Sequence, residues 1–210
     1  TLSFAEFLPF WGARHGDARR KRPYSDRGCL ERTIFLDGAL AAHTPDAPWL
    51  ETGVKALDDA FSAWCRATGP EPFLDPLLAR AIADLIEWLP RSRGTTAGRA
   101  DPSARQRVLT ACWMTKSLLP TLTPPRFAAW LSTAVRHSLG AVCEVRHGAA
   151  SCVALPEALR FHAETTRERQ RMLAAGLGWP AEGEVPLARG LEDWLDRLGV
   201  PRRLSALGVA

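Results

Sequence analysis

The segment HSLGAVCEVRHGAASCVALP, residues 137–156, holds the most informative pattern in the sequence. Two histidines, His137 and His147, stand ten positions apart in it, and a glycine follows the second at the predicted start of a helix. A histidine at such a place can ligate a metal or cap the helix. Cys143 and Cys152 flank His147, and Cys152 lies in an apolar run where burial is expected. The sequence has no G-x-S-x-G elbow of α/β-hydrolases, no H-E-x-x-H helix of zinc metalloproteases and no glycine-rich loop that binds phosphate. These three common enzyme classes therefore lose support.

Around this segment the apolar residues recur at helical spacing. Val54, Leu57, Phe61 and Trp64 lie three or four positions apart, which is typical of a helix with one buried face. The same spacing predicts further helices at about 78–89, 103–118, 125–138, 152–163, 164–177 and 186–198.

The N-terminal part of the chain has a different character. Its only plausible strand is Thr33–Leu36, which follows a stretch rich in glycine and arginine. We interpret residues 1–38 as a connector and residues 39–210 as one helical domain, in which Pro90 is expected to end the second helix. The sequence therefore predicts an all-α fold, a helical bundle with a short N-terminal extended or strand connector.

The composition is that of an ordinary folded protein. Of the 210 residues, 46% are hydrophobic and 24% are charged, which excludes a disordered or fibrous chain. Charges and prolines interrupt every apolar stretch before it reaches the roughly 18 to 20 residues of a membrane span, so no membrane contact is expected. Eight tryptophans lie on or beside apolar stripes, as Trp64, Trp113 and Trp194 do, and are expected to pack in the core.

The net charge of +4 does not by itself indicate a nucleic acid partner. The 24 arginines are scattered and are dense only between Arg14 and Arg27, where acidic residues interrupt them, so we expect no nucleic acid. The five cysteines are odd in number and form no C-x-x-C pair, which predicts free thiols in a reducing, cytoplasmic compartment. We also expect no secretion signal, because no charged segment followed by an apolar one comes after Thr1.

Across residues 137–161 the pattern H-x-L-G-A-x-x-x-V-x-H-G-x-x-S-C-V-x-L-P-x-x-L-R-F resembles the signature of the iron-containing alcohol dehydrogenase superfamily, especially its maleylacetate-reductase-like branch. Further segments resemble that family in the same order: TLSFAEF, RTIFLDGAL with HTP, LETGVKALDDA, and LGVPRRLSALGV. In the family, an N-terminal α/β domain binds NAD(P), and a helical C-terminal domain supplies metal and substrate contacts. The chain resembles the second of these halves, beginning at the junction between them.

The resemblance also implies where a metal would sit, and this sequence departs from the pattern there. The family holds a divalent metal with one aspartate and three histidines, and these positions are Lys55, Asp59, Thr133 and His147 here. An ammonium group cannot ligate a metal, and one imidazole, one carboxylate and one hydroxyl do not complete a coordination shell. We therefore expect no metal. His137 matches the active-site histidine of the family that is not a ligand.

The replacement residues still suggest chemistry. Lys55 and Asp59 lie four positions apart on one predicted helix, so they can pair. If the substrate cleft is retained, Lys55 would polarise a carbonyl or enolate oxygen, and His137 or His147 would donate or remove a proton. The alternative is a satisfied polar cluster with no turnover. His43 and His162 are interpreted as a loop residue and a helix-surface residue.

Three functions remain open from the sequence. The first is a metal-independent, non-redox enzyme, of isomerase, lyase or cyclase type, acting on an oxygen-bearing small organic substrate. The second is an NAD(P)-dependent reductase whose nucleotide-binding half is missing from this chain or carried on another, with Thr1 and Ser3 near the nicotinamide. The third is a non-catalytic partner subunit. The chain by itself is expected to hold no cofactor, and to form a homodimer or to pair with a nucleotide-binding chain. The predicted site residues are Lys55, Asp59, Thr133, His137 and His147.

Overall fold

The computed structural model describes residues 2, 7–14, 21–31, 33–67, 69–94, 98–118 and 130–209. Helices make up most of this part of the chain, which confirms the predicted all-α fold. The helices are α1 (Gly38–Ala41), α2 (Asp46–Cys65), α3 (Leu74–Arg91), α4 (Pro102–Leu118), α5 (Leu131–Val142), α6 (His147–Phe161), α7 (Ala163–Gly176) and α8 (Pro186–Leu198). The strands are β1 (Phe10–Arg14) and β2 (Lys21–Ser25), and two short 3-10 helices are Arg27–Cys29 and Leu204–Leu207.

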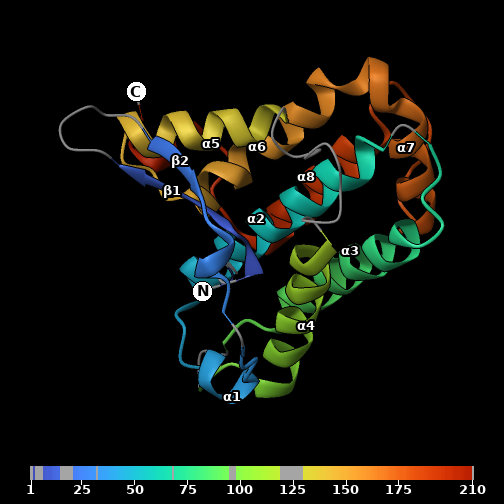
Figure 1. The fold of residues 1–210 in the computed structure, drawn as a ribbon. Coiled ribbons are helices and arrows are strands. Elements are labelled where there is room, and N and C mark those ends of the chain that lie inside the picture. Colours follow the sequence, from blue (N-terminus) through green and yellow to red (C-terminus); the bar gives the residue numbers. More distant parts are fainter. Residues whose placement is uncertain are drawn as a thin grey trace.

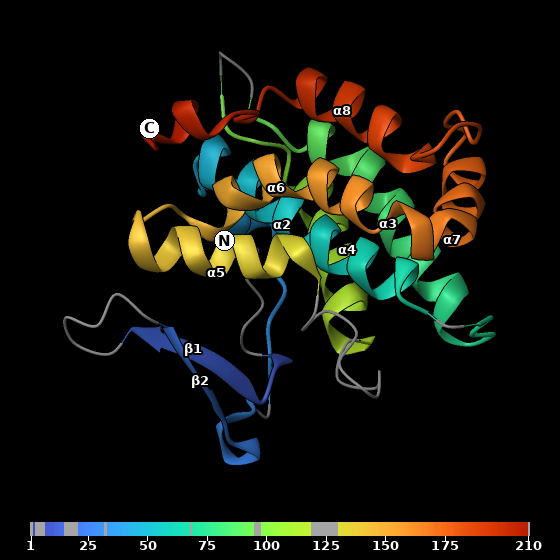
Figure 2. The ribbon, with the colours of Figure 1, turned by 90° about the horizontal axis from the view of Figure 1, so that it is seen from above.

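Helix α2 lies in the middle of the helical body (Figures 1 and 2). Its predicted apolar stripe is buried, and Val54, Leu57 and Phe61 are fully inaccessible to solvent. The helix packs against α3, α4 and α6, so it contacts neighbours on several sides. A helix surrounded in this way is buried nearly all round, which explains why Asp58 and Asp59 also lie inside the protein.

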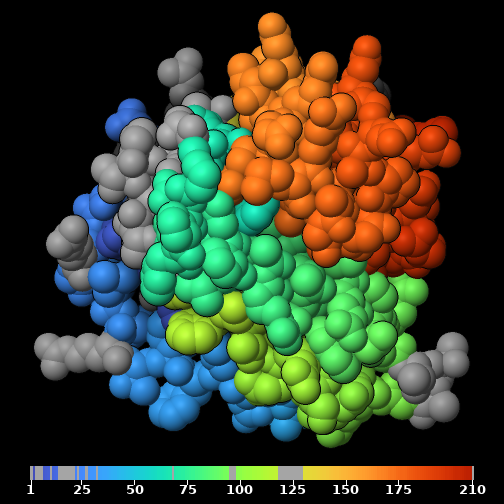
Figure 3. Space-filling view, turned by 90° about the vertical axis from the view of Figure 1, so that its right-hand side faces the viewer, coloured from blue at the N-terminus to red at the C-terminus, as the bar shows by residue number. Residues whose placement is uncertain are grey.

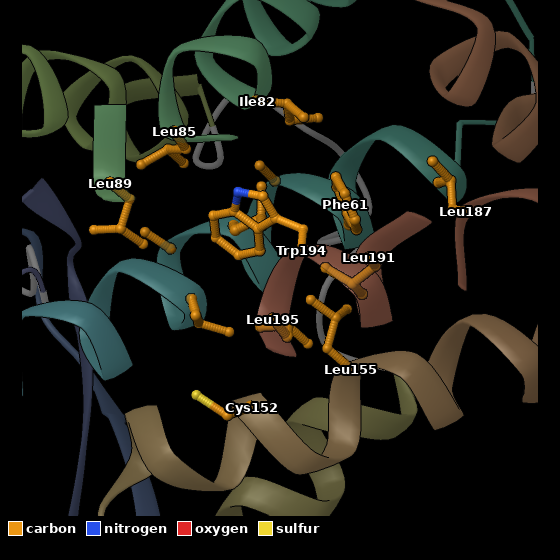
Figure 4. Packing of buried hydrophobic residues seen from close by; sticks show 14 of the residues in the cluster. Phe61, Ile82, Leu85, Leu89, Cys152, Leu155, Leu187, Leu191, Trp194 and Leu195 are labelled. Carbon is orange, nitrogen blue, oxygen red and sulfur yellow. The ribbon is translucent and has the colours of Figure 1, made fainter. Parts of the chain in front are cut away.

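The hydrophobic core lies where α2, α3, α6 and α8 meet (Figure 4). Phe61 of α2 faces a row of aliphatic side chains from α3, and Trp194 of α8 lies among them. Each fully buried side chain of this size contributes about 1.5–3 kcal/mol relative to an exposed one. The residues that Figure 4 labels in this cluster are Phe61, Ile82, Leu85, Leu89, Cys152, Leu155, Leu187, Leu191, Trp194 and Leu195.

Pro90 lies inside α3, so the expectation that it ends the helix is wrong by one residue, because α3 continues to Arg91. Proline has no backbone N–H, and the carbonyl four residues earlier, that of Ile86, therefore loses its helical donor. The indole Nε1 of Trp194 donates to this carbonyl at 3.0 Å. The tryptophan thus supplies the hydrogen bond that the proline removes, and it joins α8 to α3.

This arrangement predicts a coupling between the two residues. Replacing Trp194 with phenylalanine should cost about 1–3 kcal/mol of stability, because the part-buried carbonyl of Ile86 loses its side-chain donor. In a Pro90→Ala background the new N–H can bond to the same carbonyl, so the cost of Trp194→Phe should fall by at least about 0.5 kcal/mol. Urea unfolding of the wild type, the two single variants and the double variant measures the coupling. An equal cost of Trp194→Phe in both backgrounds would contradict it.

The two strands form an antiparallel hairpin that stands apart from the helices in Figure 2, with Phe10 opposite Ser25 and Arg14 opposite Lys21. Trp11 and Tyr24 stack on it with ring centroids 5.9 Å apart, and both remain exposed.

The predicted strand Thr33–Leu36 is wrong. The segment has no strand partner among the described residues, so it cannot form a ladder. Its apolar alternation has another cause: Leu36 packs against the core, whereas the Phe35 side chain is 88% exposed.

On one face of the molecule the side chains of α3 lie between those of α7 and α4 (Figure 3). Trp11 of β1 and Trp113 of α4 are 42% and 43% exposed, so the prediction that the tryptophans are core residues fails for both, although it holds for Trp64, Trp130 and Trp194. No helix in the described part of the chain is long and apolar enough to cross a membrane. Residues 119–129 lie outside the described residues, and so does the start of the helix expected at 125–138.

Helix α6 approaches α2 very closely at Gly148. A β-carbon at this position would lie 2.6 Å from the carbonyl carbon of Glu51 and 2.7 Å from its oxygen, so only glycine fits without a backbone shift. We expect Gly148→Ala to lower the free energy of unfolding by about 1–3 kcal/mol. Gly176→Ala is the matched control: its β-carbon would meet nothing within 4 Å, and the change should be neutral or stabilising. Thermal unfolding of both variants distinguishes close packing from a general effect of glycine replacement.

Candidate site at the junction of α2, α4, α5 and α6

Five charged side chains from three helices meet beside the core, and we call them the charge cluster. Lys55, Asp58 and Asp59 come from α2, Lys116 comes from α4, and Arg136 comes from α5. Helix α6 adds Ser151, whose hydroxyl lies 3.3 Å from Nη1 of Arg136. Three cations and two carboxylates leave the cluster with one formal positive charge.

Asp59 lies at the centre of the charge cluster. Its Oδ2 accepts from the Nζ of Lys55 at 2.8 Å, as the spacing of these two residues on one helix predicts, and also from the Nζ of Lys116. Its Oδ1 accepts from both terminal nitrogens of Arg136 at 3.1 Å. Both carboxylate oxygens are therefore engaged by cations.

Asp58 lies deeper than Asp59 and is completely buried. Its Oδ1 accepts from the Oγ of Ser132 at 2.5 Å, and its Oδ2 lies 3.2 Å from Nη1 of Arg136. Burial raises the pKa of the Asp58 carboxyl, while Arg136 opposes that shift. Arg136 therefore bridges the two adjacent carboxylates and reduces their repulsion.

The charges of Asp59 and Lys116 respond differently to burial. Burial alone would raise the pKa of Asp59, but Lys116, Lys55 and Arg136 outweigh it and hold that pKa well below its usual value. Burial lowers the pKa of Lys116, although Asp59 opposes the shift. The carboxylate faces three cations, whereas Lys116 shares one carboxylate with two other cations, so the anion is the better stabilised partner.

Solvent reaches this cluster mainly through Lys55. Its side chain is 17% exposed, whereas those of Lys116 and Arg136 are 1% and 5% exposed. The positive charge that the two carboxylates do not neutralise is thus presented to solvent chiefly by the Lys55 ammonium. Such a group can attract an anionic ligand or stabilise negative charge that develops on a bound oxygen.

The other predicted site residues lie next to this cluster. Thr133 is on α5, and its Oγ1 accepts from Nη2 of Arg136 at 2.8 Å. His137, one turn further along α5, and His147, the first residue of α6, form an edge-to-face pair with ring centroids 5.2 Å apart. His147 is on the same face of α6 as Ser151, which contacts Arg136, so both histidines lie on helices that contact or contribute to the charge cluster.

An ion pair fixes the start of α6 against α2. Arg146, just before His147, donates from Nε and Nη2 to the two carboxylate oxygens of Glu51 at 2.9 and 2.8 Å. Glu51 lies one turn before Lys55 on α2. This contact and the close approach at Gly148 place the first turn of α6 beside the part of α2 that carries Lys55.

The donor set of this site does not fit iron or another divalent metal. Lys55 and Lys116 present ammonium groups, Arg136 presents a guanidinium group, and none of these offers a lone pair to a cation. Asp59 is engaged on both oxygens by these three side chains. Within the described residues, no group of three histidine, cysteine, aspartate or glutamate side chains could hold a metal ion.

Three of the residues at this site were not predicted from the sequence: Asp58, Lys116 and Arg136. A usable signal exists only for Lys116. It follows Val108 and Cys112 at intervals of four on the buried face of α4, and a lysine on an apolar stripe indicates a buried partner. Asp58 and Arg136 are adjacent to predicted site residues but carry no such pattern.

The remaining candidates lie elsewhere or are buried. His43 is an exposed turn residue, as expected. His162 is not a helix-surface residue, because it lies between α6 and α7. Its ring stacks on that of Trp130 with the centroids 4.3 Å apart, and its Nε2 accepts from the backbone N–H of Leu131. Cys152 is buried, as predicted, whereas Cys143 is exposed. Thr1 and Ser3 lie outside the described residues.

Comparison with known sequences gives a consistent picture. Residues 49–210 match the model of the Fe-containing alcohol dehydrogenase family, C-terminal. Dehydrogenase ALT3 of Alternaria alternata is 27% identical, and the alignment covers 100% of this chain and 57% of that protein. The maleylacetate reductase of Rhizobium sp. strain MTP-10005 is 26% identical over 86% of this chain and 47% of its own length. The chain therefore spans about half the length of the curated relatives that it matches.

Solved structures agree on the fold. The crystal structure of the same Rhizobium maleylacetate reductase superimposes with a TM-score of 0.79 at 23% identity, covering 100% of this chain and 55% of that one. Sulfoacetaldehyde reductase from Bifidobacterium kashiwanohense, solved in complex with NAD+, gives a TM-score of 0.79 at 20% identity, over 98% of this chain and 52% of that one.

The named relatives are dehydrogenases and reductases. This favours the reductase alternative over the non-redox isomerase, lyase or cyclase that we expected first. The helical body, its order of segments and the match over residues 49–210 lead to one assignment: the chain belongs to the Fe-containing alcohol dehydrogenase family and corresponds to the C-terminal part of its members.

Proposed function

We propose that this chain is the helical, substrate-binding part of a nicotinamide-dependent reductase that acts on the carbonyl group of a small organic substrate. The observation that carries the proposal is the charge cluster, in which Lys55 keeps a partly exposed ammonium group. The resemblance to the family implies that Lys55 replaces an aspartate ligand of the metal. The reductases and dehydrogenases among its relatives support the class of reaction.

The cofactor, when bound, supplies a hydride to the carbonyl carbon. The 210 residues contain no glycine-rich phosphate loop, so the proposal requires a nucleotide-binding half outside them, on the same or another chain. It follows that the two parts meet at the face carrying Lys55 and the two histidines. A homodimer of such two-part subunits, or a pair of different chains, would satisfy this requirement.

Lys55 would bind the carbonyl oxygen and stabilise the negative charge that grows on it as the hydride arrives. The ion pair with Asp59 at 2.8 Å holds the ammonium in place, so little reorganisation is needed during the reaction. His137 or His147 would deliver the proton that converts the alkoxide to an alcohol. The two rings lie close enough to each other for one to orient the other.

The excess positive charge favours anionic substrates. An oxo acid carries a carboxylate that an unneutralised cation attracts, whereas a neutral aldehyde of equal size gains nothing from it. We therefore expect oxo acids to be reduced with a higher kcat/KM than matched neutral aldehydes and ketones.

The test is an assay of NADH and NADPH oxidation by the full product of the gene, with a panel of oxo acids and size-matched neutral carbonyl compounds. Oxidation of either cofactor that depends on the carbonyl substrate supports the proposal. The 210-residue chain alone serves as a control and should show no such oxidation. Conversion of a carbonyl substrate without any nicotinamide would instead support the non-redox enzyme, and no conversion at all would support a binding subunit.

A further inference from the structure

Lys116 is the least accessible cation of the charge cluster. It comes from α4, which contributes nothing else to the charge cluster, and its side chain is only 1% exposed. Its ammonium donates to Oδ2 of Asp59, the same oxygen that binds Lys55. Because its side chain is inaccessible, Lys116 cannot touch a substrate. Any effect that it has on a bound substrate must therefore pass through Asp59.

The neighbours of Lys116 also show why its charge matters. Asp58 and Asp59 are adjacent and buried, and one formal charge from Arg136 cannot neutralise both. Lys55 lies at the solvent edge, so it gives the buried oxygens of Asp59 only partial compensation. Lys116 adds a positive charge from the protein side, in direct contact with the buried carboxylate of Asp59.

We propose that the Lys116 ammonium is a built-in replacement for the divalent metal of this family, holding Asp59 in place and leaving no room for iron or zinc. This inference concerns the charge balance of the site and does not depend on the proposed reaction. It assigns Lys116 a positioning role: the lysine orients the Asp59 carboxylate, and Asp59 in turn orients Lys55.

Two features make entry of a metal unfavourable. An incoming divalent ion would meet three positive side chains, and it could bind Asp59 only after displacing at least one of them. The imidazole of His147 then remains as the only ligand of the family's set that this chain retains. The positive charge at the site therefore comes from side chains of the protein and not from a bound metal ion.

The first arm of the test measures metal content. The protein is produced in medium supplemented with iron and zinc, dialysed against buffer without chelator, and analysed by mass spectrometry for metal per chain. We expect substoichiometric iron and zinc, and no change in Tm when Fe2+ or Zn2+ is added. One iron or zinc per chain that survives dialysis would overturn the proposal, whatever the activity of the protein.

The second arm isolates Lys116 by restoring the family's ligands. The triple variant Lys55→Asp, Asp59→His, Thr133→His is compared with the quadruple variant that also carries Lys116→Met. We expect the quadruple variant to bind Zn2+ at least about tenfold more tightly than the triple variant, because the internal cation is gone. Equal affinities would show that Lys116 does not occupy the role of the metal. Circular dichroism confirms folding, and if either variant is unfolded the first arm still decides.

Discussion

Replacing Asp59 with asparagine should lower the free energy of unfolding by about 3–5 kcal/mol, because it leaves buried cations without their carboxylate. The substitution keeps the shape of the side chain and removes only its charge. Lys116 and Arg136, which are buried, and Lys55 would then face one another without the carboxylate that all three contact. Urea unfolding, with the midpoint and slope both determined, measures the loss.

Two further variants show whether the loss comes from uncompensated charge. In the double variant Asp59→Asn, Lys116→Met, removal of one buried cation should recover at least about 1 kcal/mol. Glu87→Gln is the matched control on an exposed pair, since Glu87 accepts from Arg91 at 2.7 Å with both side chains about half exposed, and it should cost under about 1 kcal/mol. A small effect of Asp59→Asn with no recovery would show that the charge cluster contributes little to stability.

The pH dependence follows from the sign of the Asp59 shift. Its folded-state pKa lies well below the ordinary value of 3.8, so its ionised form stabilises the protein above that pH. This stabilisation is lost as the pH falls through the folded-state pKa. The part of the stability difference between the wild type and Asp59→Asn that comes from the Asp59 charge should therefore shrink in strong acid.

The helices could be predicted from the sequence because local patterns encode them. The spacing of Val54, Leu57 and Phe61 requires one buried face, and the i, i+4 relation of Lys55 and Asp59 is sufficient to predict their pair. The strand prediction at Thr33–Leu36 failed because alternation shows which side chains are buried, and does not show whether the backbone has a partner. That information is non-local.

The charge cluster shows the same limit at the site itself. Lys116 and Arg136 reach Asp59 across 57 and 77 positions of the chain, and nothing in the local sequence specifies these contacts. The sequence could show that the family's metal ligands had been replaced by Lys55, Asp59 and Thr133. Which distant side chains compensate the buried carboxylates depends on how α4 and α5 pack on α2, and only the fold reveals that.

Replacing Lys55 with methionine should reduce kcat/KM for carbonyl reduction by about 10²- to 10³-fold, in the range observed when one donor to a developing oxyanion is removed. Methionine keeps an unbranched apolar side chain of similar length and removes the ammonium. Asp59 retains Lys116 and Arg136 as partners, so the fold should be little affected. The prediction is thus a loss of activity without a comparable loss of stability, the reverse of the effect expected from a purely structural ion pair.

The division between kcat and KM adds a second criterion. A group that acts on charge developing in the transition state lowers kcat and kcat/KM equally, whereas a group that only attracts an anionic substrate raises KM. Steady-state kinetics of the full gene product with an oxo acid distinguishes the two. Arg91→Met removes one exposed cation far from the charge cluster in the chain and is the control for net charge, so it should leave both parameters unchanged.

Lys55→Arg tests geometry at constant charge. The guanidinium group is planar and bulkier than an ammonium, so it restores the attraction for an anion but not the position of the donor. We expect KM close to that of the wild type with kcat only partly recovered. If Lys55→Met and Lys55→Arg both retain full kcat, the ammonium has no role in turnover, and the charge cluster is a structural network around two buried carboxylates.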